Sequence, residues 1–193
     1  MQGDGVTGSC HNMTAAVMLA VLMLLTACSQ PAVEKENDAY YWRTEWRLDS
    51  IERAFIEEHH ISKVFCRFFD VVTGDATEEP MPNATLRFAD SVPRGLTLVP
   101  TVYITEECMH QRHDGLARRV IDRVMQMWLT NDLPCRPGEL QIDCDYTVRS
   151  RQVYYDFLAE MRSEAQKHGI RLSTTIRLHQ LTMEVPPVDY GVL

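Results

Sequence analysis

The sequence lacks an excess of positive charge, a hydrophobic run of membrane-spanning length and any CxxC pair. The 193 residues carry a formal net charge of -8, which disfavours binding to the phosphate backbone of nucleic acids. The six cysteines are too few and too scattered for a disulfide scaffold, and their spacing does not indicate a zinc ribbon. We therefore expect no nucleic-acid partner, no metal and no cofactor. The 45% of hydrophobic residues is typical of a globular protein.

The apolar run near the N-terminus extends from Ala15 to Leu25. A helix of this length is too short to cross about 30 Å of hydrocarbon, but it suits the core of a signal peptide. The residues Leu25-Thr26-Ala27-Cys28 that follow resemble the bacterial lipobox, in which the cysteine is lipid-modified and becomes the new N-terminus. We predict a lipoprotein signal peptide over residues 1–27, with Met1 or Met13 as the start, and lipidation of Cys28.

A polar segment follows Cys28. Residues 28–39 contain one proline and no apolar periodicity, which predicts a flexible tether. The lipobox resemblance, with Ser29 beside the cysteine, implies sorting to the outer membrane. We therefore expect a protein held in the bacterial cell envelope by a lipid in the membrane, with its globular part starting at Tyr40.

Strand-like and helix-like segments alternate in the globular part. Strands are expected at residues 40–44, 63–71, 97–105, 140–146 and 171–178, and a sixth begins at 188–193. Helices are expected after an Asp49–Ser50 cap, over 116–131 and around 153–165, with Gly169 as a left-handed cap. Residues 73–94 are rich in Pro, Gly, Asp and Glu and predict a long loop instead of a helix. Strands separated by helices indicate a parallel sheet.

Two architectures fit this alternation: an open doubly wound sheet and a (β/α)8 barrel. No Gly-rich phosphate loop follows the first strand, which weakens the dinucleotide-binding version of the open sheet. Polar side chains share one face of several expected strands: Thr101, Tyr103 and Thr105; Gln141, Asp143 and Asp145; Ser173, Thr175, Arg177 and His179. Both faces of a doubly wound sheet should be apolar, whereas the inner face of a barrel opens onto an active site. The pattern favours an incomplete (β/α)8 barrel.

The pair Asp143 and Asp145 lies at the expected C-terminal end of a strand. Burial and mutual repulsion would raise the pKa of such carboxyls, and Arg177, Arg67 or Arg43 would offset this. One interpretation is a charged pocket that holds a polar ligand or supplies an acid and a base. The other is a structural Asp–Arg network inside a barrel.

Residues 139–147 (ELQIDCDYT) resemble the D-x-x-D-x-D-x-E signature of family 18 chitinase-like barrels. Asp143 and Asp145 fall on the second and third acids, and Tyr146 falls on the aromatic position. Leu140 takes the first acid position, and Thr147 replaces the proton-donating Glu of that family. A threonine hydroxyl does not protonate a glycosidic oxygen near neutral pH, so the chitinase mechanism is not implied.

The wider chain resembles an uncharacterised group of bacterial lipoproteins with a glycoside-hydrolase-like barrel. The matching runs are YYWRT, RFFDV, QIDCDYT, TTIRLHQ and PPVDYGVL, which cover most of residues 40–193. The resemblance implies a partial barrel of about five strands plus the start of a sixth. A complete barrel has about 250 residues, so we expect this chain to be truncated at its C-terminus.

Two functions follow from this resemblance and both stay open. In the first, the full protein is an enzyme acting on glycans, with Asp145 as acid/base and Asp143 tuning its pKa. The residues expected to hold the sugar are Arg67, Tyr103, Tyr146, Arg177 and His179. In the second, the protein is a non-catalytic glycan-binding or scaffold lipoprotein.

Two further residue groups have simpler interpretations. His110 and His113 have metal-like spacing, but no suitable ligand set accompanies them apart from Cys108. Cys66 and Cys144 lie in apolar strand-like runs, which favours buried free thiols over disulfides.

Overall fold

The computed structural model describes residues 37–74 and 78–177 of the chain. The predicted signal peptide, Cys28, most of the predicted tether, His179 and the predicted sixth strand lie outside the described residues. In the described ranges, no helix is long and apolar enough to cross a membrane.

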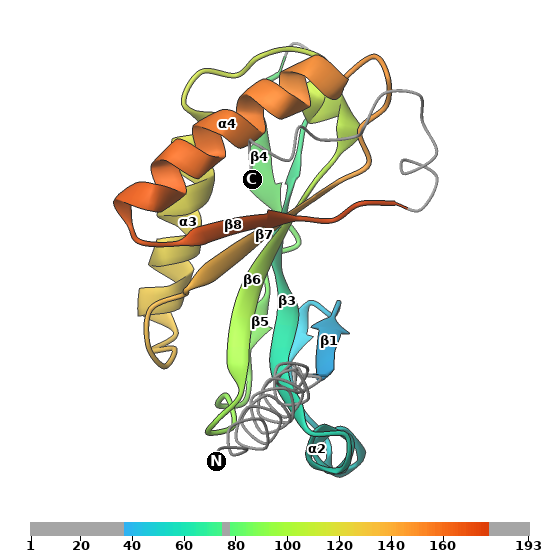
Figure 1. The fold of residues 1–193 in the computed structure, drawn as a ribbon, viewed down its shortest axis with the longest axis vertical. Helices are drawn as coiled ribbons and strands as arrows, with labels where there is room; N and C mark the ends of the chain where they lie inside the picture. The colour runs from blue at the N-terminus through green and yellow to red at the C-terminus, as the bar shows by residue number, and fades with distance from the viewer. Residues whose placement is uncertain (1–36, 75–77, 178–193) are drawn as a thin grey trace, which may run out of the picture. The chain divides into compact units, whose positions relative to one another are not determined.

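Five parallel strands form the central sheet, in the order β1-β3-β6-β7-β8 (Figure 1). They are β1 (Asn37–Tyr41), β3 (Ile61–Val72), β6 (Thr97–Ile104), β7 (Glu139–Cys144) and β8 (Arg171–Thr174). A short strand, β4 (Met81–Asn83), pairs antiparallel with the end of β3. Among the strands of residues 37–74 and 78–177, the spatial order follows the chain order, without the reversal found in a doubly wound sheet. The predicted α/β class with parallel strands is confirmed.

Strand β1 begins three residues before the Tyr40 start expected from the sequence. Asn37 and Asp38 are polar and give no hydrophobic signal, so their place in the sheet depends on tertiary contacts. The Asn37 side-chain amide donates a hydrogen bond of 2.7 Å to the carbonyl of His59. The Asp38 carboxylate lies 3.8 Å from the Lys63 ammonium group on β3.

The described residues form three α-helices where the sequence predicts helices: α2 (Ser50–Glu58), α3 (Leu116–Thr130) and α4 (Arg151–Lys167). Asp49 forms a capping box at α2, because its carboxylate accepts the backbone N–H groups of Ile51 and Glu52 while the Glu52 side chain accepts that of Asp49. Gly169 follows α4 with φ +71°, the left-handed conformation expected for it.

Helices α3 and α4 pack on one face of the sheet (Figure 1). That face is apolar and includes Val102, Ile104, Leu140 and Ile142, all buried. The Phe68 ring of β3 stacks on Trp128 of α3 with a centroid distance of 5.9 Å. The buried Tyr154 hydroxyl of α4 lies 2.7 Å from the Thr174 hydroxyl of β8, which provides its hydrogen-bond partner. The core therefore forms between these helices and one side of the strands.

The described part of the crossover from β3 to β6 contains no helix, as its Pro and Gly content predicts. The crossover instead contains an extended segment, in which the short strand β5 (Arg87–Phe88) pairs with β2 (Glu45–Trp46). Trp46 is fully buried here, with its ring centroid 4.7 Å from that of Tyr41 and 6.3 Å from that of Phe88. The indole therefore packs between β1 and the crossover.

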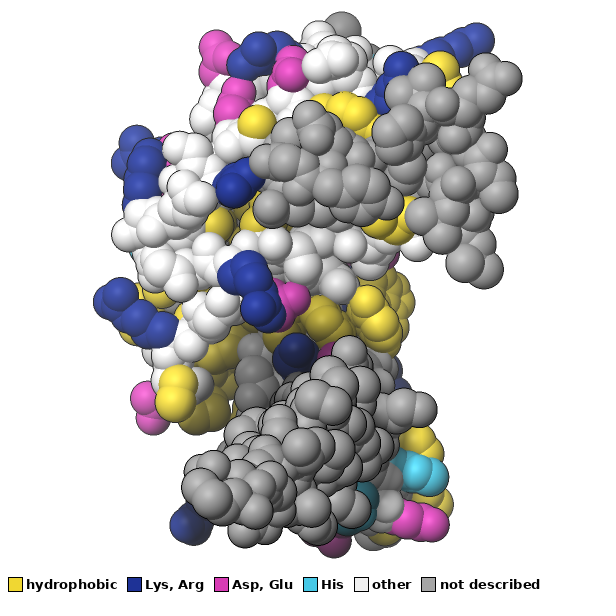
Figure 2. Space-filling view, viewed as in Figure 1, with side chains coloured by type: hydrophobic (Ala, Val, Ile, Leu, Met, Phe, Trp, Pro, Cys, Tyr) yellow, Lys and Arg dark blue, Asp and Glu magenta, His cyan; other side chains and the backbone are white. Residues whose placement is uncertain are grey.

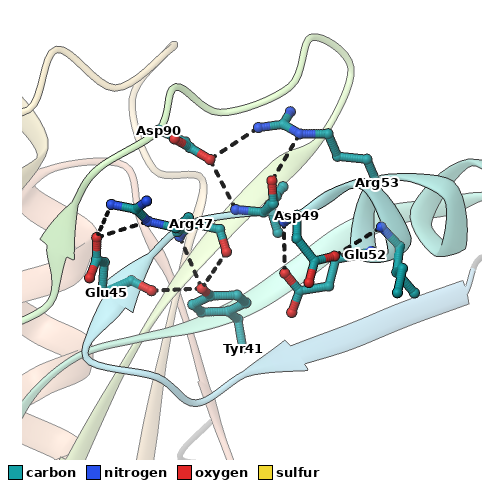
Figure 3. A network of polar contacts seen from close by, with 9 residues as sticks. Tyr41, Glu45, Arg47, Asp49, Glu52, Arg53 and Asp90 are labelled. Carbon is teal, nitrogen blue, oxygen red and sulfur yellow. Dashed lines mark hydrogen bonds and ion pairs between the residues drawn. The ribbon is translucent and has the colours of Figure 1, made fainter.

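A polar network fixes the segment between β1 and α2 (Figure 3). The Tyr41 hydroxyl lies 2.6 Å from the carbonyl oxygen of Glu45 and accepts the Arg47 N–H at 3.0 Å. The Asp90 carboxylate, from the crossover, accepts the Leu48 N–H and an Arg53 guanidinium N–H at 3.1 Å each. These bonds join β1, α2 and the crossover.

The four cysteines of the described ranges are free thiols. Cys66, Cys108 and Cys144 are buried and Cys135 is exposed. Burial raises the pKa of the Cys66 and Cys144 thiols well above the ordinary range. The expectation of buried thiols at positions 66 and 144 is confirmed.

Candidate functional site

The sheet face that points away from α3 and α4 is polar. The strand register aligns Arg67, Thr101, Gln141 and Ser173 in one row across β3, β6, β7 and β8. Asp70, Tyr103 and Asp143 form the next row toward the carboxyl ends of the strands. We call the following residues the polar face: Arg67, Asp70, Thr101, Tyr103, Gln141, Asp143, Asp145, Ser173, Thr175 and Arg177.

A β-bulge in β3 shapes this face. Residues three apart on a regular strand point to opposite faces, yet the pairing shifts register between Arg67 and Phe69. Arg67 and Asp70 consequently lie on the same face, where the guanidinium binds the carboxylate through two hydrogen bonds, one of them 2.6 Å long from Nε to Oδ1. Both side chains are largely buried. Figure 2 shows Lys and Arg side chains spread over the visible surface, with Asp and Glu side chains beside some of them.

Asp145 follows the end of β7 and brings three of the predicted site residues together. Its carboxylate forms an ion pair with the Arg177 guanidinium. The Tyr103 hydroxyl lies 3.4 Å from its other oxygen, which is a long contact for a hydrogen bond. Burial raises the pKa of the Tyr103 phenol, and the Asp145 carboxylate adds to this effect. Strand alternation predicted that Tyr103, Asp143, Asp145 and Arg177 share one face of the sheet, and this placement is confirmed.

Asp143 lies deeper in the face. Its Oδ1 accepts a hydrogen bond of 2.5 Å from the Thr175 hydroxyl. Burial raises the pKa of Asp143 and the nearby Asp145 carboxylate adds to the rise, while the Thr175 hydroxyl and Arg177 oppose it. Asp143 is thus a carboxyl group that holds its proton to higher pH than an exposed aspartate does.

This raised pKa has a consequence for stability. The ordinary pKa of an aspartate is 3.8, and the pKa of Asp143 in the folded chain is higher. Between these two pKa values the folded chain holds more protons at Asp143 than the unfolded chain does. The free energy of unfolding therefore falls as pH rises from the lower pKa to the higher one. An Asp143→Asn variant cannot ionise there. We expect the stability of the variant relative to the wild type to increase between about pH 4 and about pH 7, measured by urea denaturation.

The hydroxyl of Thr175 supplies a matched control. Thr175→Val removes the hydrogen bond that favours ionised Asp143, so this variant should lose more stability than the wild type over the same pH interval. A difference between wild type and Asp143→Asn that stays constant or shrinks as pH rises would contradict the assignment.

The structure does not bring all predicted residues into the polar face. Tyr146 is buried, and its ring stacks on Tyr154 of α4 at a centroid distance of 4.7 Å. Burial raises the pKa of the Tyr146 phenol. Arg43 is exposed and pairs with Glu52 of α2 at 2.8 Å. His179 and Cys28 lie outside the described residues.

Glu106 was not anticipated from the sequence. It begins the 3-10 helix η1 (Glu106–Met109) that follows β6, so its carboxylate lies near the carboxyl ends of the strands. Its Oε1 accepts hydrogen bonds from the hydroxyls of Thr147 at 2.5 Å and Ser150 at 3.0 Å. The Thr147 hydrogen bond lowers the pKa of Glu106. A carboxylate therefore lies directly beside Thr147.

The histidines near this helix do not complete a metal site. The His110 Nε2 lies 3.7 Å from the Glu106 carboxylate. Throughout residues 37–74 and 78–177, no group of three or more His, Cys, Asp or Glu side chains is placed to hold a metal ion.

In comparisons with known proteins, no family model, no curated protein and no solved structure matches the chain.

Proposed function

We propose that the polar face binds a glycan. In this proposal the chain is a lipid-anchored protein of the bacterial cell envelope, and its globular part is an incomplete (β/α)8 barrel of the glycoside-hydrolase-like kind. The strand order supports the barrel, because consecutive strands are neighbours and the helices α3 and α4 cover one face. A polar opposite face is what the interior of such a barrel presents near its active site.

One observation carries the glycan proposal: the cluster of Tyr103, Asp143, Asp145 and Arg177 at the carboxyl ends of β6, β7 and β8. Carboxylates accept hydrogen bonds, a guanidinium donates them, and hydroxyl groups do both. Sugar hydroxyls require such mixed donors and acceptors at fixed positions. The Arg177–Asp145 pair and the Thr175–Asp143 bond hold these groups in place without ligand.

Binding without hydrolysis is the favoured function. Asp145, the expected acid/base, is ion-paired with Arg177, and Thr147 stands where the resembling family has its proton donor. Hydrolysis is the second candidate, and one observation favours it. The pKa of Asp143 is raised and that of Glu106 is lowered, which is the separation that an acid and a base need.

A panel of soluble oligosaccharides tests the proposal. The full chain and its Asp145→Asn variant are incubated with chitotetraose, cellotetraose, maltotetraose and polygalacturonate fragments, and both binding and hydrolysis are measured. Separately, palmitate labelling tests whether Cys28 carries the lipid anchor. We expect the wild type to bind at least one member, Asp145→Asn to bind it about tenfold more weakly, and neither to hydrolyse it. Hydrolysis by the wild type that is lost in the variants Asp143→Asn and Glu106→Gln would support the second candidate. Absence of binding by the wild type would contradict both.

A further inference from the structure

Two exposed aromatic rings lie beside the polar face. Tyr40 is 58% exposed at the end of β1, and Trp42, which follows that strand, is 43% exposed. The Tyr40 ring stacks on Phe65 of β3 at a centroid distance of 5.0 Å, and the Trp42 ring meets Tyr40 edge-on at 6.3 Å. The Arg67 guanidinium carbon lies 5.8 Å from the Trp42 ring centroid. Both rings therefore lie on the same side of the sheet as Arg67.

The residue between them explains why they are exposed there. The Tyr41 ring packs against the buried Trp46 on the opposite side, and its hydroxyl is held by Glu45 and Arg47 (Figure 3). Successive side chains of a strand point to opposite faces, so anchoring Tyr41 directs Tyr40 and Trp42 toward the polar face. The two rings are consequently held in position before any ligand binds, which lowers the entropic cost of binding.

The rings are continuous with the polar cluster. Arg67 contacts Trp42 and binds Asp70, which is in register with Tyr103 of β6, and Tyr103 is in register with Asp143 of β7. Neighbouring strands are about 4.8 Å apart, so the surface from β1 to β7 extends over roughly 14 Å. This is longer than one sugar ring, and it fits a short oligosaccharide.

We propose that Tyr40 and Trp42 form an aromatic subsite that stacks against one pyranose ring of an oligosaccharide. A pyranose has an apolar C–H face and a rim of hydroxyl groups. The indole and phenol rings match the apolar face, and the Arg67–Asp70 pair beside them matches the hydroxyl rim. The inference rests on the proposed glycan binding and adds the position and chemistry of one subsite.

Tryptophan fluorescence tests the subsite selectively. The chain has three tryptophans, and Trp46 and Trp128 are 0% and 4% exposed, so iodide reaches only Trp42 readily. We expect the panel oligosaccharide that binds most tightly to protect the wild-type chain from iodide quenching. The variants Trp42→Ala and Trp42→Phe lack this indole, so calorimetry measures their affinities. Trp42→Ala should bind the oligosaccharide about tenfold more weakly, and Trp42→Phe should keep most of the affinity. The control Phe55→Ala removes an aromatic ring of α2 that is 51% exposed, and it should bind as the wild type does.

The outcomes separate this inference from the proposed function. Wild-type affinity in a folded Trp42→Ala variant overturns the subsite and leaves glycan binding intact. Absence of binding to any panel member by the wild type overturns both. Self-association of the wild type that Trp42→Ala abolishes, without glycan binding, identifies a protein interface and also overturns both.

Discussion

Replacing Trp46 by alanine is expected to lower the free energy of unfolding by about 3–5 kcal/mol. The indole is fully buried and contacts Tyr41 of β1 and Phe88 of the crossover. Alanine would leave a cavity between β1 and the crossover. Because domains are stable by only about 5–15 kcal/mol, this loss is a large fraction of the total stability, and urea denaturation followed by circular dichroism measures it.

Trp42 provides the matched control for this prediction. It is the same residue type four positions earlier, but it is 43% exposed. Trp42→Ala should cost less than about 1 kcal/mol, because exposed substitutions remove few packing contacts. Equal losses for the two variants would contradict the assignment of Trp46 to the core and of Trp42 to the surface.

Breaking the Arg67–Asp70 pair is expected to have the second large effect. The Arg67 and Asp70 side chains are 18% and 11% exposed, and two hydrogen bonds join them. Arg67→Met leaves the Asp70 carboxylate largely buried without its guanidinium partner. We expect a loss of about 3 kcal/mol in the free energy of unfolding at neutral pH, measured by urea denaturation.

The double variant Arg67→Met/Asp70→Leu separates the value of the pair from the cost of an unpaired charge. Replacing both partners by apolar groups removes the uncompensated charge, so the double variant should recover most of the lost stability. A double variant as unstable as the sum of the two single variants would show that the two side chains do not act as a pair.

Local signals in the sequence predicted much of this fold. Asp49 followed by Glu52 predicts a helix start and Gly169 predicts a helix end, because capping depends on residues a few positions apart. Strand alternation similarly placed Tyr103, Asp143, Asp145 and Arg177 on one face.

The rest of the site depends on long-range geometry that alternation does not describe. Counting by twos places Arg67 and Asp70 on opposite faces, and the bulge in β3 that unites them leaves no sequence signal. Trp42 lies beyond the end of β1, so its direction follows from the anchoring of Tyr41. Tyr146 was predicted to lie in the site, but its ring stacks on Tyr154 of α4 in the core, away from Asp145.

Hydrogen–deuterium exchange of the full chain, with and without the tightest-binding oligosaccharide of the panel, tests the central claim most directly. If the polar face binds the glycan, backbone exchange should slow at residues 101–105 and 143–147, at the carboxyl ends of β6 and β7. A groove of about 340 Å³, lined by Leu96, Leu98, Pro134 and Arg136 among others, lies at the opposite ends of these strands. Protection confined to that groove would contradict the account.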